Sequence, residues 1–130
     1  MKEFSNKWKS SKKPRKQRKY AANAPLHIRK DFLKVQLSKP LRAKYNRRNV
    51  LVRKGDKVRI MRGQFFGIVG KVESVDYNAS RVYVEGASLA KKDGAKSSYP
   101  LHPSNLQIQE MVLDDKFRIK SIGRTMVNKK

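Results

Sequence analysis

A run of alternating apolar residues interrupted by four glycines constrains this chain more than any other feature. The run covers residues 54–75, KGDKVRIMRGQFFGIVGKVESV. Val58 and Ile60 alternate with Lys57 and Arg59, which is the period-two pattern of a half-buried strand. Glycine adopts positive φ or admits a close backbone neighbour more readily than other residues. The run therefore predicts a strand, a tight glycine loop and a second strand.

The spacing in this run resembles the KOW motif, in which Gly-Asp precedes a strand, spaced glycines form a loop, and a second strand opens on Val or Ile. The matching positions are Gly55, Asp56, Val58, Gly63, Gly67, Gly70 and Val72. The resemblance implies a small SH3-like barrel that binds RNA or the transcription and translation machinery. We expect Asp56 to brace the Gly55 turn. The motif usually has Lys or Arg before its middle glycine, where this chain has Phe66, so Phe65 and Phe66 are expected to offer stacking or a protein contact.

The charge of the chain indicates a polyanionic partner. Among 130 residues, 33 are Lys or Arg and 10 are Asp or Glu, for a formal net charge of +23. Such an excess is self-repulsive, and nucleic acid is the leading partner that relieves it. Residues 1–54 hold 19 of the basic residues and 2 of the acidic ones. An anionic membrane is the main rival, but no apolar run approaches the roughly 18 residues of a spanning helix, so we expect no membrane insertion.

Residues 1–22 are polar, basic and aperiodic, and we expect them to form an extended basic arm that becomes ordered on a partner. Trp8 and Tyr20 lie among its basic residues and suit stacking on bases or sugars. The alternatives are a solvated tail without function or an import-like signal.

Residues 23–50 are expected to form short helices beside the barrel. The first begins at Asn23 or Ala24, with a proline in its first turn, and ends near Val35. The second is capped by Ser38. Their basic side chains would face phosphates, or else they are ordinary solvated faces.

The overall prediction is a mainly β fold: a small SH3-like (KOW) barrel over residues 51–110, a basic N-terminal extension containing short helices, and a short C-terminal helix with a basic tail over residues 111–130. The remaining expected elements are a bulged strand over 71–75, a turn over 77–80, a strand over 81–85, a basic hairpin over 87–99, a turn over 100–103, a closing strand over 106–109 and a helix over 113–124.

The residues expected to bind RNA carry a positive charge or a ring. They are Lys12, Lys13, Arg15, Lys16, Arg18, Lys19, Tyr20, Arg29, Lys30, Arg42, Lys44, Arg47, Arg48, Arg53, Lys54, Arg59, Arg62, Phe65, Lys71, Lys91, Lys92, Lys96 and His102. His102 either caps a turn or touches RNA, and we favour the turn.

The sequence does not suggest an enzyme. Its two histidines, His27 and His102, lie in different segments, its carboxylates are scattered, and it has no cysteine. No metal-ligand or triad spacing emerges, so no catalytic residue, metal or cofactor is expected. Asp114 and Asp115 are interpreted as acidic residues at a helix N-terminus.

Longer stretches extend the resemblance beyond the glycine loop. They are PRKQRK (14–19), NAPLHIRK (23–30), LSKPLRAKY (37–45), VRKGDKVRIMRG (52–63), VYVEGASLAKKDG (82–94) and YPLHPSNL (99–106). Over residues 14–124 the chain resembles the archaeal form of large-subunit ribosomal protein twenty-four, a family whose eukaryotic members are numbered twenty-six. The resemblance implies a structural, cytoplasmic protein that binds the 5′ domain of large-subunit ribosomal RNA early in assembly, near the tunnel exit. Its expected partners are that RNA, neighbouring ribosomal proteins and factors at the exit, without a homo-oligomer.

A regulatory binding module is the alternative function. Through its KOW segment such a module would act on RNA polymerase or nascent RNA, and the Phe65-Phe66 pair motivates this hypothesis. Factors of that kind typically carry a further amino-terminal domain, for which we expect no room in this chain.

Overall fold

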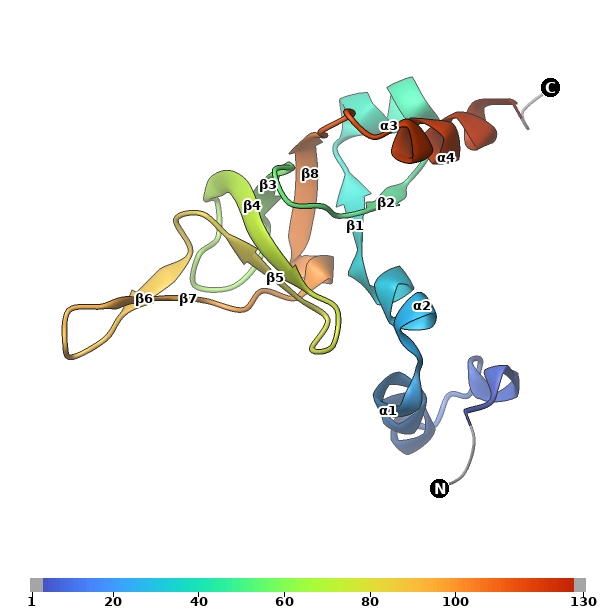
Figure 1. The fold of residues 1–130 in the computed structure, drawn as a ribbon, viewed down its shortest axis with the longest axis horizontal. Helices are drawn as coiled ribbons and strands as arrows, with labels where there is room; N and C mark the ends of the chain where they lie inside the picture. Colours follow the sequence, from blue (N-terminus) through green and yellow to red (C-terminus); the bar gives the residue numbers. More distant parts are fainter. Residues whose placement is uncertain (1–3, 128–130) are drawn as a thin grey trace.

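An open β-sheet forms the centre of the protein in the computed structural model, which describes residues 4–127. Within that range six strands pair in the order β2-β1-β8-β3-β4-β5. The strands are β1 (Lys34–Leu37), β2 (Asn49–Leu51), β3 (Lys57–Ile60), β4 (Val69–Asp76), β5 (Arg81–Val84) and β8 (Leu106–Glu110). β1 and β8 are parallel, and the other pairs are antiparallel. The expectation of a mainly β fold with added helices is therefore confirmed (Figure 1).

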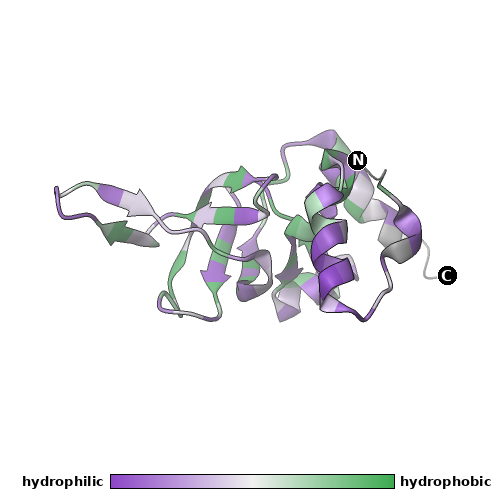
Figure 2. Ribbon diagram, turned by 90° about the horizontal axis from the view of Figure 1, so that it is seen from below, coloured by the Kyte–Doolittle hydropathy of each residue, from purple (hydrophilic) through white to green (hydrophobic). Residues whose placement is uncertain are grey.

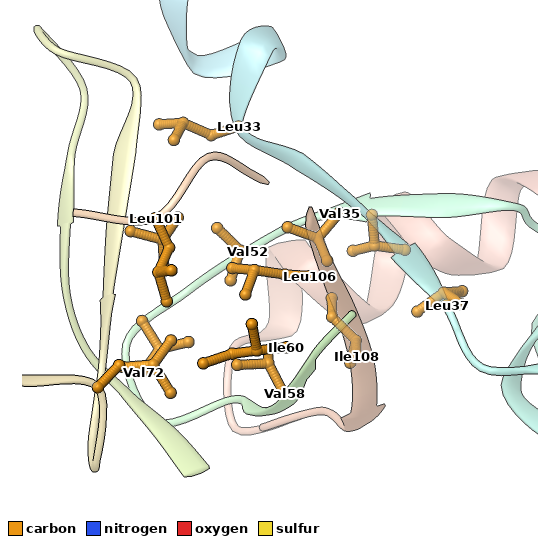
Figure 3. Close-up of a cluster of buried hydrophobic side chains, with 14 residues drawn as sticks. Leu33, Val35, Leu37, Val52, Val58, Ile60, Val72, Leu101, Leu106 and Ile108 are labelled. Carbon is orange, nitrogen blue, oxygen red and sulfur yellow. The ribbon is translucent and has the colours of Figure 1, made fainter. Parts of the chain in front are cut away.

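Aliphatic side chains from all six strands form one hydrophobic core. Val58 and Ile60 of β3 are fully buried, as are Leu106 and Ile108 of the neighbouring β8. Figure 3 shows these side chains converging with those of the other strands. Hydrophobic and hydrophilic residues alternate along the strands in Figure 2, as expected for strands with one face in a core. The period-two pattern of the sequence thus correctly identified Val58 and Ile60 as the inward residues of β3.

The expected closed SH3-like barrel is not confirmed, because the sheet is open. Among the described residues its two end strands, β2 and β5, do not pair with each other. β1 and β2 were not predicted as strands, and they extend the sheet beyond β8 instead of closing it. The bulge predicted in β4 is present, since the β4–β5 register shifts between Val72 and Ser74. Such a bulge bends a strand and increases its twist.

The prediction of an extended arm over residues 1–22 is wrong for its second half. Asn6–Trp8 form a short 3-10 helix, η1, and Pro14–Asn23 form α1. Pro14 stands in the first turn, where its fixed φ favours a helix, and the following Lys, Gln, Arg and Ala residues are good helix formers. No residue of α1 is buried. The helix therefore lacks the apolar stripe on which a prediction from periodicity depends.

The helix predicted from about residue 23 to Val35 is shorter than expected. α2 covers Leu26–Arg29, the 3-10 helix η2 covers Lys30–Leu33, and β1 follows. Val35 belongs to β1, not to the helix, and its side chain is fully buried. Val35 and Leu37 fit a strand because alternate residues of β1 enter the core.

The next helix, α3 (Lys39–Tyr45), was predicted correctly. Ser38 occupies its N-cap position and a proline stands in its first turn, although the Ser38 side chain makes no capping hydrogen bond. The helix ends at Asn46, which has the left-handed conformation common at helix C-termini.

The C-terminal half follows the predicted order. β4, β5 and β8 lie where strands were expected, and β6 (Ser88–Ala90) and β7 (Lys96–Ser98) form the predicted hairpin. The turn expected over residues 100–103 begins later, because Leu101 pairs with Val82 and η3 covers Pro103–Asn105. α4 (Lys116–Val127) begins three residues later than expected. The Asp115 carboxylate accepts the Phe117 N–H at 2.9 Å, which explains this start and confirms Asp115 as a helix-terminal acid.

Candidate nucleic-acid interface

The glycine loop between β3 and β4 has the conformation that its sequence predicts. Gly67 has a φ of +86°, and its N–H donates to the Ile60 carbonyl at 2.9 Å. Gly70 is required for a different reason, because a Cβ there would lie 2.3 Å from the Glu85 carbonyl oxygen. The loop therefore needs the left-handed backbone of Gly67, and it needs Gly70 to admit a neighbouring backbone segment of the same chain.

Asp56 braces the turn before β3, as predicted, and also anchors α4. Its carboxylate is fully buried and accepts the Arg53 N–H at 2.9 Å and the Val112 N–H at 3.0 Å. Arg118 of α4 forms a bidentate pair with the same carboxylate, at 2.7 and 2.6 Å. Arg118 also donates to the carbonyls of Val112 and Leu51. Sequence reasoning missed Arg118 because nothing local in α4 indicates a partner 62 residues away.

The two phenylalanines of the loop have different environments. Phe65 is half-buried and packs against the core and the Tyr99 ring, with the two centroids 5.1 Å apart. Phe66 is 63% exposed. Phe65, which we predicted to bind RNA, therefore has a packing role here. Phe66 is therefore the exposed ring of the loop.

The outer face of the β3–β4 pair is basic. Lys57 and Lys71 are directly opposite in the register, and Arg59 lies two residues along β3 on the same face. Glu110 of β8 neutralises Lys57 at 3.1 Å. Arg59 and Lys71, both predicted to bind RNA, are exposed and are brought close together by the strand pairing.

The β6–β7 hairpin carries basic side chains away from the sheet. Figure 1 shows it projecting on the side of the sheet away from α1, and Figure 2 agrees. Its turn is fixed by Asp93, whose carboxylate accepts the Ala95 N–H at 3.1 Å. Lys91, Lys92 and Lys96 are exposed at or beside this turn. The hairpin tip and α1 thus form two basic surfaces that the fold keeps apart.

α1 and the residues just before it form the second of these surfaces. The basic residues there are Lys12, Lys13, Arg15, Lys16, Arg18 and Lys19, all exposed except the half-buried Lys16. Tyr20 is half-buried and contacts the rings of Phe4 and Phe32, at centroid distances of 5.1 and 6.2 Å. Tyr20, predicted to stack on RNA, therefore holds α1 to its neighbours. The Trp8 side chain lies outside the described part of the structure.

Four of the arginines predicted to bind RNA donate to the protein itself. Arg29 binds the carbonyls of Ala22, Ala24 and Asn78, which ties α1 and α2 to the β4–β5 turn. The other three partnerships are Arg42 with Leu37 and Gln36, Arg47 with Ser121, and Arg53 with Asp115. The contacts of Arg29 thus position the basic surface on α1. Lys30, Lys44, Arg48 and Lys54 are exposed within two residues of these arginines.

His102 has the turn role that we favoured. Its Nδ1 accepts the Ser104 N–H at 3.2 Å, which places His102 at the N-cap of η3. Partial burial, with the nearby Arg81 charge, lowers the pKa of His102 below its usual 6.5. The ring is therefore neutral at pH 7. Because Nδ1 accepts, the ring proton lies on Nε2.

A hollow of about 250 Å³ lies between the glycine loop and the turn at His102, and we refer to it as the loop hollow. Its lining includes Arg62, Gln64, Arg81, Tyr99, His102 and Asn105. A second hollow beside β3 and β4 is lined by Lys57, Lys71, Glu85 and Glu110 among others. The second hollow balances its charges, whereas none of the residues that line the loop hollow is acidic.

The part of the chain that the structure describes contains neither a candidate metal site nor a candidate membrane-spanning helix. Within residues 4–127 no group of three or more His, Asp or Glu side chains is placed to hold a metal ion. No helix in that range is long and apolar enough to cross a membrane.

Comparison with known proteins identifies a family and a similar relative. Residues 11–125 match the family of ribosomal proteins that are called L26 in eukaryotes and L24 in archaea. The large ribosomal subunit protein uL24 of Methanosphaera stadtmanae is 52% identical over 114 residues, which make up 88% of this chain and 97% of that relative. The matched region runs from the residues before α1, through the sheet and the hairpin, into α4.

Proposed function

The chain belongs to the family of eukaryotic L26 and archaeal L24 ribosomal proteins, and from this premise we propose that it binds large-subunit ribosomal RNA through the basic surfaces on α1, the β3–β4 face and the hairpin tip. Membership confirms the resemblance that the sequence suggested. It makes the chain a structural protein of the large ribosomal subunit, in a non-enzymatic class, and places it on the ribosome in the cytoplasm.

The arrangement of basic residues is the observation that carries the RNA proposal. Exposed lysines and arginines cover α1, the hairpin tip and the β3–β4 face, while the core and the Asp56–Arg118 pair hold the sheet between them. On the β3–β4 face, Arg59 and Lys71 are exposed and are brought close together by the strand pairing. RNA phosphates are attracted to such basic surfaces, and their neutralisation releases counterions.

The finer parts of the proposal concern where and when the chain binds. We assign it to the 5′ domain of the ribosomal RNA, to early assembly, and to a position near the tunnel exit, with neighbouring ribosomal proteins and exit factors as partners. The support is the sequence resemblance, which spans residues 14–124. A rigid sheet with basic elements on separate sides suits a protein that bridges distant RNA segments during assembly. The SH3-like relationship is also a proposal, supported by the bulged β4 and by the glycine loop.

A salt series on two RNAs tests the proposal. The purified chain is titrated with the 5′ domain of large-subunit ribosomal RNA and with a scrambled RNA of equal length. We expect tighter binding to the 5′ domain at near-physiological salt, because charge attraction alone weakens steeply as salt rises and does not discriminate between sequences. Equal affinity for both RNAs across the series would refute specific binding.

The alternative is a regulatory module that contacts RNA polymerase or nascent RNA, and the exposed Phe66 ring favours it. Fractionation distinguishes the two functions. A ribosomal protein should remain with large subunits through a high-salt wash. Recovery in polymerase fractions, with loss from the washed subunits, would support the regulatory module instead.

A further inference from the structure

We infer that the loop hollow is a binding site for a single unpaired nucleotide of RNA, with its phosphate held by Arg62 and Arg81 and its base placed against Tyr99, His102, Gln64 and Asn105. The inference rests on the proposed RNA-binding function. It adds a defined site for one nucleotide. Several residues of this site lie outside the KOW motif, and the motif resemblance does not predict that they come together.

The size of the hollow suits one small group. Its volume of about 250 Å³ is below the roughly 300–1,000 Å³ of pockets that enclose drug-sized ligands. The walls come from three segments that are distant in sequence: the glycine loop, Arg81 of β5, and residues 99–105. The Met61 N–H donates to the Asn105 carbonyl at 2.7 Å, so the start of the glycine loop and residues 99–105 are joined by a backbone hydrogen bond. The site is therefore built before a ligand arrives.

The charge of the hollow favours an anion. Arg62 and Arg81 both line it, and none of its lining residues is acidic. Arg81 is half-buried, which reduces the screening of its charge by water. In the second hollow Lys57 is paired with Glu110, and Glu85 lies beside Lys71. An RNA phosphate would therefore prefer the loop hollow, where guanidinium groups offer paired donors.

The polar and aromatic lining favours a base next to that phosphate. Unstacked RNA bases bind proteins by stacking on aromatic rings and by hydrogen bonds to their edges. The Tyr99 ring is fixed by Phe65, and the His102 ring is fixed by Ser104. Gln64 and Asn105 provide amides that both donate and accept, and the neutral His102 presents an Nε2–H donor. A free phosphate would use only the arginines.

Crosslinking locates the nucleotide directly. The full chain is bound to the 5′ domain RNA, irradiated with short-wave ultraviolet light, digested with trypsin and nuclease, and analysed by mass spectrometry. The glycine loop and residues 99–105 fall in separate tryptic peptides, residues 63–71 and 97–116. We expect nucleotide adducts on Tyr99 or His102 in the second peptide. Adducts confined to α1 and the hairpin tip would overturn the inference.

Matched charge variants test the phosphate contact. The double variant Arg62→Gln/Arg81→Gln removes two positive charges from the hollow. The control Lys34→Gln/Lys39→Gln removes two exposed charges outside the proposed RNA-binding surfaces, and the first of them is paired with Asp31. We expect the hollow variant to lower the affinity for the 5′ domain at least about tenfold more than the control does. Equal losses of affinity in the two variants would overturn the site.

Gln64→Ala tests the base contact, and because Gln64 is exposed in the loop the variant should fold. We expect it to reduce the preference for the 5′ domain over scrambled RNA without changing the salt slope, since base contacts specify and phosphate contacts do not. An unchanged preference would mean that only a phosphate is bound and would overturn the nucleotide site. If the wild-type chain shows no preference for the 5′ domain over scrambled RNA but is crosslinked at Tyr99 or His102, the proposed function is refuted while the nucleotide site is supported.

Discussion

At the scale of single residues, the stability of the fold depends most on the buried ion pair between Asp56 and Arg118. Asp56 is fully buried and Arg118 is 5% exposed. Removing one member of such a pair leaves an uncompensated buried charge. We therefore predict that Arg118→Met destabilises the chain by about 3–5 kcal/mol, measured by urea unfolding.

Two further variants separate charge from packing at this site. Lys120→Met changes an exposed residue of the same helix and should shift stability by no more than about 0.5 kcal/mol. Asp56→Asn/Arg118→Met removes both charges and should be less destabilised than Arg118→Met alone. If the double variant were as unstable as the single one, the buried charge would not be the cause.

His102 gives a residue-scale prediction for pH dependence. Its folded pKa is lowered by burial and by Arg81, so the unfolded chain binds protons more readily. The stability that this histidine contributes is therefore fully present above pH 6.5 and falls as the pH drops through its folded pKa. Unfolding titrations at several pH values should show this fall in the wild-type chain. His102→Gln should lack it, and an identical pH dependence in both proteins would contradict the assignment.

At the scale of elements, α1 is predicted to supply phosphate contacts, not stability. None of its residues is buried, and basic side chains cover it and the segment before it. Substituting Arg15, Arg18 and Lys19 by Gln should lower the salt slope of RNA binding by about 0.7–0.9 for each phosphate that is no longer neutralised. The thermal midpoint of the free chain should stay near that of the wild type. A lowered midpoint with an unchanged slope would assign α1 a folding role instead.

The elements also show which features a sequence can reveal. β3, β5 and β8 were predictable because their residues alternate cleanly between core and surface. β1 was missed because Val35 also fits the helical spacing of the residues before it, and only pairing with β8 selects the strand. α1 was missed because it has no apolar stripe. Among the residues that line the loop hollow, Arg62 and His102 could be identified in the sequence from their charge and ring chemistry. Their proximity to Arg81 could not be predicted, because it depends on tertiary structure.

At the scale of the whole molecule, the net charge of +23 sets the response to salt. Self-repulsion destabilises a compact chain, and added salt screens it. We predict that the thermal midpoint of the free protein rises between low and near-physiological sodium chloride. A variant with Lys12, Lys13, Lys91 and Lys92 changed to Gln should show a smaller rise. A midpoint that falls with salt in both proteins would mean that favourable ion pairs outweigh the repulsion.

The position of β8 within the sheet bears on how the chain is made. β8 lies between β1 and β3, yet it is translated 69 residues after β1 ends, as the bounds Lys34–Leu37 and Leu106–Glu110 show. Until β8 has left the ribosome that synthesises it, β1 and β3 have no strand to join them. The apolar side chains of β1 and β3 that pack against β8 therefore remain uncovered until β8 has been translated. Completion of the sheet is thus a late event of the chain's own synthesis, because it follows translation of β8.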